Sequence, residues 1–186
     1  MTCKYSHLFS PGQIGTLKLK NRVVMAPVDS IFRTEAGAFN EQHQFYLGAR
    51  AAGGVGLIVC DNATVDYPRG AVGSKAARLD QDRFTAALNE VADEVHLWDA
   101  AIMMQICHAG RQTTLGGSQG IPLVSASAIA WDYSGTIPVE LSISEVKAMI
   151  NAFADAAVRV HRAGCDGVEV HACNGYLLSS FMSRAL

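Results

Sequence analysis

Short apolar runs alternate with amphipathic stretches along most of this chain, and this alternation restricts the fold more than any other feature. Unbroken apolar runs predict buried strands, and apolar residues spaced three and four apart predict helices. The predicted strands cover residues 23–25, 55–60, 100–106 and 167–170, and the predicted helices cover residues 40–52, 81–98 and 142–164, with a further helix from Tyr176. Such an order is typical of a parallel sheet with right-handed helical crossovers.

Each predicted helix has an apolar stripe that we expect to face the sheet. The first stripe consists of Phe45, Ala49 and Ala52. The stripe of the second helix consists of Phe84, Leu88, Val91, Val95 and Trp98, and that of the third helix consists of Val146, Met149, Ile150, Phe153, Ala157 and Val160. A capping box of Ser142 and Glu145 predicts the start of the third helix.

Two architectures fit this order, a closed (β/α)8 barrel and an open doubly wound sheet. A GxGxxG fingerprint after a strand would favour the open sheet, but the glycines within 53–56 precede a strand. We therefore predict an α/β fold of the (β/α)8 TIM-barrel type, with an N-terminal β-hairpin in residues 9–24. Eight units need about 250 residues. We expect residues 1–186 to form one domain without an internal linker, equivalent to the first four βα units and hence the N-terminal half of a barrel.

Composition and charge exclude several classes of function. The chain has 186 residues, of which 49% are hydrophobic and 17% are charged, and its formal net charge is −2. No basic run indicates a nucleic-acid partner. The first residues lack a signal-peptide core, and no apolar run reaches the roughly 18 residues of a membrane span. We expect a soluble, cytoplasmic protein that binds neither nucleic acid nor a membrane.

The cysteines predict free thiols and no metal site. There are five of them and no CxxC motif, which fits a reducing compartment. A zinc site made of Cys107, His108, His171 and Cys173 is not expected, because their separations match no compact ligand spacing.

Three polar residues follow the last predicted strand within six positions. His171, Asn174 and Tyr176 would lie at the carboxyl-terminal rim of a barrel, where active sites of this fold are found. His171 and Asn174 are candidate donors to a substrate oxygen, and the Tyr176 phenol is a candidate proton donor. The alternative is that His171 and Asn174 satisfy the loop backbone while Tyr176 packs.

Two other strand ends offer weaker candidates. Gln105 ends the third strand, and its amide both donates and accepts, which suits a heterocycle edge such as a flavin pyrimidine. The alternative is a bond to its own loop. Residues 25–27 end the first strand, and their small size lets a planar ligand approach the backbone. Residues 107–143 form a long excursion of the kind that serves as a lid.

Four stretches taken together resemble one family. They are LFSPGQIGTLKLKNRVVMAPV, GARAAGGVGLIV, QICHAGR and DGVEVHACNGYLLSSF. The chain resembles the old yellow enzymes, flavin-dependent ene-reductases that include the dienoyl-CoA-reductase-like and bile-acid-inducible branches, from about Leu8 to Phe181. The resemblance implies an oxidoreductase whose TIM barrel holds FMN, which takes hydride from NAD(P)H. The flavin then passes it to the β-carbon of an α,β-unsaturated carbonyl compound, either an enone or an enoyl thioester.

The resemblance also assigns roles to residues of this chain. His171 and Asn174 match the pair that hydrogen-bonds the substrate carbonyl oxygen, and His171 also contacts the flavin. Tyr176 matches the residue that protonates the α-carbon. Gln105 matches the glutamine that faces the flavin pyrimidine. All four are therefore expected at one site.

Flavin-lining positions also follow from the resemblance. The backbone of Ala26, Pro27 and Val28 matches a stretch that lines the flavin, and Asn62 falls near another such position. Asp29 departs from the pattern, since the family often has Thr or Cys there. An ionised carboxylate at this position would oppose reduction to an anionic flavin.

Several alternatives remain open at this stage. The second half of a barrel would carry the flavin phosphate loops and, in the dienoyl-reductase-like branch, cysteines for an iron–sulfur cluster. One alternative is therefore a truncated, non-catalytic fragment without the FMN phosphate site, which self-associates through open barrel edges. A dihydroorotate-dehydrogenase-like FMN barrel ranks lower, because the HxxNGY arrangement does not support it. The choice between NADH and NADPH is open.

Overall fold

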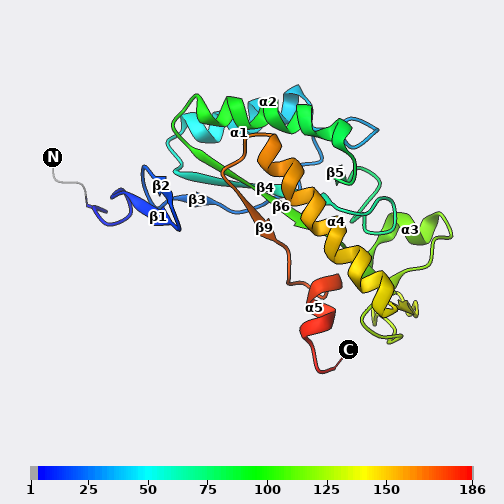
Figure 1. Cartoon of the computed structure of the whole chain (residues 1–186). Coiled ribbons are helices and arrows are strands. Elements are labelled where there is room, and N and C mark those ends of the chain that lie inside the picture. The colour runs from blue at the N-terminus through cyan, green and yellow to red at the C-terminus, as the bar shows by residue number, and fades with distance from the viewer. Residues whose placement is uncertain (1–3, 186) are drawn as a thin grey trace.

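The central sheet of the computed structural model, which describes residues 4–185, is parallel and follows chain order (Figure 1). Its main path is β3-β4-β6-β9, and β5 pairs with β4 off this path. The strands are β3 (Val24–Met25), β4 (Leu57–Thr64), β5 (Ala77–Arg78), β6 (Ala101–Cys107) and β9 (Gly167–Val170). The helices that connect them are α1 (Glu41–Ala52), α2 (Thr85–His96) and α4 (Ile143–Arg162).

This topology distinguishes the barrel from the open sheet. Each strand of the main path pairs with the one before it, so the order never reverses. A doubly wound sheet reverses its order and carries helices on both faces. Here α1 packs on α2 and α2 on α4, and all three contact the same side of the sheet. The described residues therefore form four successive βα units of a β/α barrel, as predicted.

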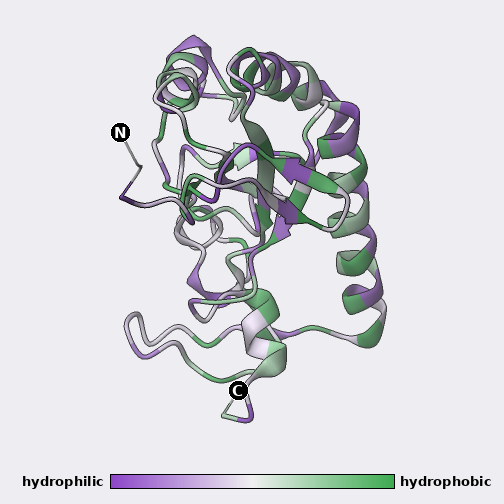
Figure 2. Cartoon of the chain, turned by 90° about the vertical axis from the view of Figure 1, so that its left-hand side faces the viewer, coloured by the Kyte–Doolittle hydropathy of each residue, from purple (hydrophilic) through white to green (hydrophobic). Residues whose placement is uncertain are grey.

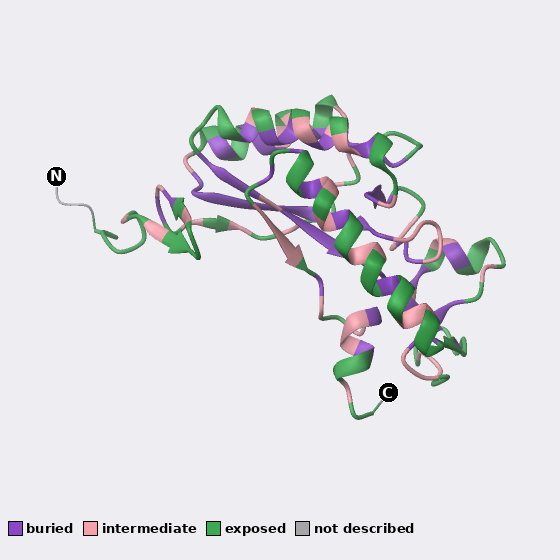
Figure 3. Cartoon of the chain, viewed as in Figure 1, coloured by how far each residue is buried: buried purple, intermediate pink, exposed green. Residues whose placement is uncertain are grey.

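The hydrophobic core lies between this helical layer and the sheet (Figure 3). Alternate strand residues face the helices, because successive side chains of a strand point to opposite faces. The strands contribute Ile58, Cys60, Ile102, Met104 and Ile106, and the helices contribute Leu47, Leu88, Val91, Val95, Met149 and Val160. The opposite strand face carries Leu57 and Ala101 near the amino-terminal ends of the strands and Gln105 and Glu169 near their carboxyl ends. Hydrophilic colour marks the strand arrowheads at the centre of Figure 2.

The predicted stripe of α1 is wrong. Phe45, Ala49 and Ala52 are all exposed, Phe45 to 64%. The helix is rotated because Gly48 lies directly against α2, where an added Cβ would stand 2.5 Å from the Glu94 carboxylate. Its buried face consists of His43, Leu47, Gly48 and Ala51.

The other two stripes are largely confirmed. Phe84 lies in the short 3-10 helix η1 (Asp82–Phe84), and it is buried with the stripe residues of α2. Trp98 is 48% exposed because α2 has ended at His96. On α4, Ile150 is 62% exposed, and Ala156, which was not part of the predicted stripe, is buried. The capping box of Ser142 and Glu145 is present.

Strand β4 is longer than predicted. It continues past Cys60 to Thr64, so Asp61 and Asn62 belong to the strand and not to the following loop. The pairing with β6 shifts register between Cys60 and Ala63. An irregularity of this kind re-aims the side chains within it. Asp61 consequently contacts His43 of α1, whereas Asn62 contacts Cys107 of β6.

The hairpin and the excursion complete the fold. The predicted hairpin is the antiparallel pair β1 (Gly12–Ile14) and β2 (Leu17–Leu19). The excursion contains the 3-10 helix η2 (Gly110–Gln112), the helix α3 (Thr114–Ser118) and the parallel pair β7 (Val124–Ser125) and β8 (Val139–Glu140). Helix α5 (Leu177–Met182) follows β9. Within residues 4–185, no helix has the length and apolar character needed to cross a membrane.

Candidate active site

The carboxyl ends of β4, β6 and β9 bring together polar residues on the sheet face opposite the helices. Gln105 and Glu169 are register partners on β6 and β9, and Gln105 Nε2 donates to Glu169 Oε1 at 2.6 Å. Cys107 Sγ lies 3.5 Å from Asn62 Oδ1. These contacts place the predicted residues Asn62 and Gln105 on one face, at the edge where a barrel builds its active site.

The partner of Gln105 decides what its amide can offer a ligand. An ionised carboxylate only accepts hydrogen bonds, so Glu169 turns the amide nitrogen of Gln105 toward itself. The amide oxygen remains as an acceptor for an N–H group. Sequence reasoning missed Glu169, although its position two residues before His171 places both side chains on the same strand face.

The loop after β9 holds the catalytic candidates. The amide of His171 donates to Ile106 O at 3.0 Å, which continues the sheet pairing by one residue. His171 is 7% exposed, and its ring stacks on Tyr176 with centroids 4.7 Å apart and an interplanar angle of 22°. Cys173 Sγ lies 3.8 Å from His171 Nδ1. Asn174 is exposed, and its φ of +58° reverses the loop before α5.

Burial shifts the pKa values of both rings in the direction that the predicted roles require. Desolvation lowers the pKa of His171, against smaller raising effects of its backbone hydrogen bond and of Glu169. The imidazole is therefore neutral at pH 7. Desolvation raises the pKa of Tyr176, and Cys107, Asp29 and Cys173 raise it further. The phenol therefore keeps its proton throughout the physiological range.

The segment after β3 presents free backbone. Ala26 and Val28 are exposed, Val28 to 53%, and Pro27 is half-buried. Within residues 4–185 the amides of Ala26 and Val28 have no hydrogen-bond partner. Asp29 follows with a half-exposed carboxylate that pairs with Arg33 Nη1 at 2.8 Å. The expected unfavourable charge at Asp29 is thus compensated by a neighbouring guanidinium.

A buried ionic cluster joins the loop after β3 to α1 and β4, and the sequence did not predict it. Asp61 pairs with Arg33 through Oδ2 and with His43 Nε2 through Oδ1 at 3.0 Å. Burial would raise the pKa of Asp61, but the hydrogen bond and charge of His43 and the charge of Arg33 lower it overall. Cys60 Sγ lies 3.5 Å from His43 Nε2 and from Asp61 Oδ1.

This buried cluster contains residue types that can bind a metal ion, but a positively charged arginine lies within it. Among the described residues, His43, Cys60 and Asp61 are the only three ligating side chains whose donor atoms all lie within 4.8 Å of one another. Arg33 already holds the Asp61 carboxylate, and its fixed positive charge opposes a cation there. We interpret the cluster as a structural one, which holds α1, β4 and the loop after β3 together.

Comparisons with known proteins match this fold and identify its family. The profile of the NADH:flavin oxidoreductase / NADH oxidase family matches residues 7–186. The chain is 45% identical over 179 residues to an NADH oxidase of Thermoanaerobacter brockii, covering 96% of this chain and 28% of that protein. A solved 2-naphthoyl-CoA reductase in complex with 2-naphthoyl-CoA superposes with a TM-score of 0.91 at 27% identity, covering 97% of this chain and 29% of that one.

A morphinone reductase in complex with tetrahydroNAD superposes with a TM-score of 0.85 at 28% identity, covering 95% of this chain and 52% of that one. The fold and these matches place the chain among barrel proteins of the flavin oxidoreductase class. The chain belongs to the NADH:flavin oxidoreductase / NADH oxidase family. It spans between about a quarter and a half of the length of the curated relatives it matches.

Proposed function

We propose that this protein is an NAD(P)H-dependent flavin oxidoreductase that reduces the C=C bond of an α,β-unsaturated carbonyl compound. The observation that carries the proposal is the site at the end of β9. There a neutral His171 and a protonated Tyr176 stack on each other. Asn174 lies on the same loop, exposed, and its side-chain amide has no hydrogen-bond partner within residues 4–185. Family membership supports flavin and a nicotinamide reductant.

The rim residues fit a flavin, and we propose that it is FMN. The acceptor oxygen of Gln105 suits the N–H of a pyrimidine ring, and Asn62 lies on the same face. The free amides of Ala26 and Val28 are donors for a planar ring that lies on the backbone. When bound, the flavin supplies hydride transfer, and the protein binds and orients the reactants.

His171 and Asn174 bind and polarise the substrate carbonyl. The Cys173 thiol, 3.8 Å from His171 Nδ1, donates to that nitrogen, which leaves the ring proton on Nε2. Nε2–H and the Asn174 amide then both donate to the substrate oxygen. Donors fixed in this way stabilise the negative charge that develops on the oxygen during hydride transfer.

Tyr176 delivers the proton that completes the reduction. Its raised pKa keeps the phenol protonated, and the stack on His171 holds the ring beside the carbonyl site. A general acid contributes when it stands close to the atom that it protonates. Tyr176 therefore donates its phenolic proton to the α-carbon.

The substrate class rests on the two structural neighbours. One is a morphinone reductase, and the other is a reductase with a naphthoyl thioester bound. Both names support a conjugated carbonyl compound, either an enone or an enoyl thioester, as the substrate of this protein. Because the neighbours differ in the group attached to the carbonyl, we expect the excursion over residues 107–143 to select between these classes.

The proposal is tested by loading the purified protein with FMN and removing the excess. We expect a retained, shifted flavin absorbance band and NADH- or NADPH-dependent reduction of 2-cyclohexen-1-one, which is followed by the loss of nicotinamide absorbance under nitrogen. Retained flavin with no enone turnover would overturn the substrate class. Absence of retained flavin would overturn the flavin assignment for this chain.

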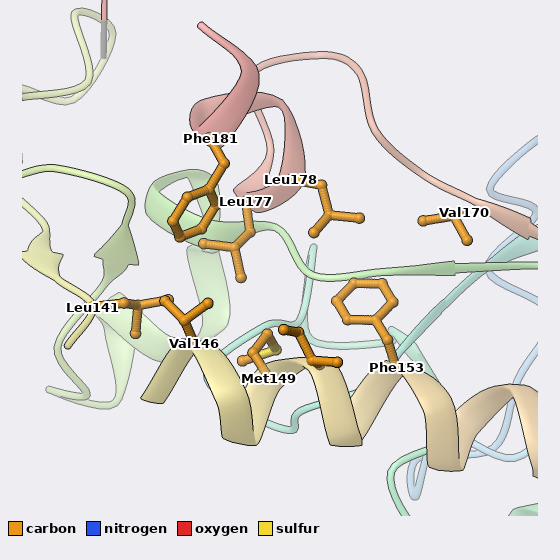
Figure 4. Close-up of a pocket in the computed structure, with 9 residues that line it drawn as sticks. Leu141, Val146, Met149, Phe153, Val170, Leu177, Leu178 and Phe181 are labelled. Carbon is orange, nitrogen blue, oxygen red and sulfur yellow. The ribbon is translucent and has the colours of Figure 1, made fainter. Parts of the chain in front are cut away.

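One observation favours a second candidate, a non-catalytic half-barrel that associates through its edges. Among the described residues, β3 and β9 each pair with a single strand of the sheet. Beside β9, an apolar groove of about 330 Å³ lies between α4 and α5 (Figure 4). Its lining includes Met149, Phe153, Leu177 and Phe181. A flavin-free protein that sediments as a dimer or larger would support this candidate.

A further inference from the structure

The loop that carries Asn174 is held from outside by the side chain of Gln112. Gln112 Nε2 donates to the Asn174 carbonyl oxygen at 2.8 Å, although 62 positions separate the two residues. Gln112 is half-buried at the end of η2. The amide nitrogen lies so close to the loop that a Cβ added at Gly175 would stand 2.5 Å from it.

The loop needs such a support because its backbone is unusual. Asn174 and Gly175 both have left-handed conformations, with φ of +58° and +74°. A non-glycine residue in this region carries a conformational cost and persists only where neighbouring contacts hold it. Within residues 4–185, the only hydrogen bond that the Asn174 carbonyl accepts comes from Gln112.

The backbone of η2, which carries Gln112, is held by close contacts with the start of α5. Gly110 has φ of +61°, and a Cβ there would stand 2.9 Å from the amide nitrogen of Leu177. The Leu177 amide donates to His108 O at 3.1 Å, and the Gly110 amide donates to His108 Nδ1 at 3.0 Å. The start of the excursion and the start of α5 are thus in direct backbone contact. Gln112 follows this contact at the end of η2.

We propose that Gln112 is a positioning residue that orients the Asn174 amide toward the substrate oxygen. This role presupposes the carbonyl reduction proposed above. Gln112 acts on the substrate only through the Asn174 backbone. A neutral amide suits the task, because it donates to the carbonyl at any pH, whereas an ionised carboxylate of the same size would repel that oxygen.

The difference in charge between an amide and an ionised carboxylate allows a direct test in the flavin-loaded protein. Gln112→Ala should lower kcat/KM for 2-cyclohexen-1-one about 3- to 10-fold, the equivalent of one neutral hydrogen bond. Gln112→Glu should be at least as impaired at pH 8. It should recover toward wild type as the pH falls through the glutamate pKa, about 4.3 or somewhat higher when half-buried, because a protonated carboxyl donates again.

The matched control is Gln119, which is exposed at the end of α3 and caps that helix through its backbone. Gln119→Ala and Gln119→Glu should keep the wild-type kcat/KM at every pH. A ratio of Gln112→Glu to wild type that does not change with pH, or one that equals unity at pH 8, would overturn the positioning role.

A second readout does not depend on turnover. Hydrogen exchange of the peptide that spans residues 171–178, measured by mass spectrometry, should be about tenfold faster in Gln112→Ala than in wild type, and unchanged in Gln119→Ala. An unchanged exchange rate in Gln112→Ala would show that Gln112 does not hold the loop that carries Asn174. If the wild-type protein reduces no enone, the proposed function fails, and the exchange rates still decide whether Gln112 holds the loop.

Discussion

Two polar clusters of this molecule, the buried one around Asp61 and the one at the carboxyl ends of β6 and β9, differ in how completely their groups are paired. In the buried cluster, both carboxylate oxygens of Asp61 are bonded, and among its guanidinium nitrogens Arg33 leaves only Nε without a partner. At the rim, the side chain of Asn174 and the amide oxygen of Gln105 have no partner within residues 4–185. Paired polar groups tie segments together, and unpaired groups at a strand end are available to a ligand.

Asp29 connects the two clusters. It pairs with Arg33 of the buried cluster, and its charge also contributes to the raised pKa of Tyr176 at the rim. If the distinction is correct, changes at the rim should affect turnover and, at pH 7 and above, leave stability nearly unchanged. Changes in the buried cluster should do the reverse.

The largest expected effect is that of Tyr176→Phe on turnover. Removing the phenolic proton should slow reoxidation of the reduced flavin by enone by about 10²- to 10⁴-fold, the usual contribution of a general acid. Stopped-flow absorbance separates this step from flavin reduction by NAD(P)H, which should persist. Tyr133→Phe, at a position 88% exposed, is the matched control. An unchanged reoxidation rate would show that Tyr176 does not supply the proton.

The next largest effect is that of Arg33→Met on stability. The change leaves the Asp61 carboxylate buried without its guanidinium, which costs about 3–5 kcal/mol in comparable buried pairs. Urea unfolding followed by circular dichroism measures the free energy of unfolding. Lys147→Met, which removes an exposed positive charge on α4, should stay within about 0.5 kcal/mol of wild type. A similarly small change for Arg33→Met would contradict a tying role for the buried cluster.

The smallest expected effect is the change of turnover with pH in the range between the pKa of His171 and the pKa of Tyr176. His171 must be neutral, and its pKa lies below the ordinary 6.5, whereas Tyr176 must be protonated, and its pKa lies above the ordinary 10.0. Enone reoxidation of the flavin should therefore be flat from about pH 6.5 to 10. It should fall only as the pH drops through the lowered His171 pKa or rises through the raised Tyr176 pKa.

The same shifts set the sign of the pH dependence of stability. A histidine with a lowered folded-state pKa leaves stability unaffected above pH 6.5 and reduces it as the pH falls below that value. His108, whose pKa is lowered by burial, acts in the same direction. Unfolding free energies measured from pH 8 to pH 5 should decline, and His171→Gln should decline less than wild type. An equal decline in both proteins would exclude His171 as a contributor.

The sequence by itself determined the order of the elements and most of the catalytic candidates. Strand and helix periods are local properties, and so are the Ser142–Glu145 capping box and the His171 to Tyr176 spacing. Each is encoded within a few consecutive residues. The rim location of these candidates also followed, because the carboxyl ends of consecutive parallel strands meet at one edge.

Only the tertiary structure decided which groups are paired. The partners of Gln105 and Asn174 lie 64 and 62 positions away, and the bulge that turns Asp61 toward His43 exists only when β4 pairs with β6. The face of α1 was set by its close contact with α2 at Gly48. Contacts between distant segments depend on the packing of several elements at once, and no local period records them.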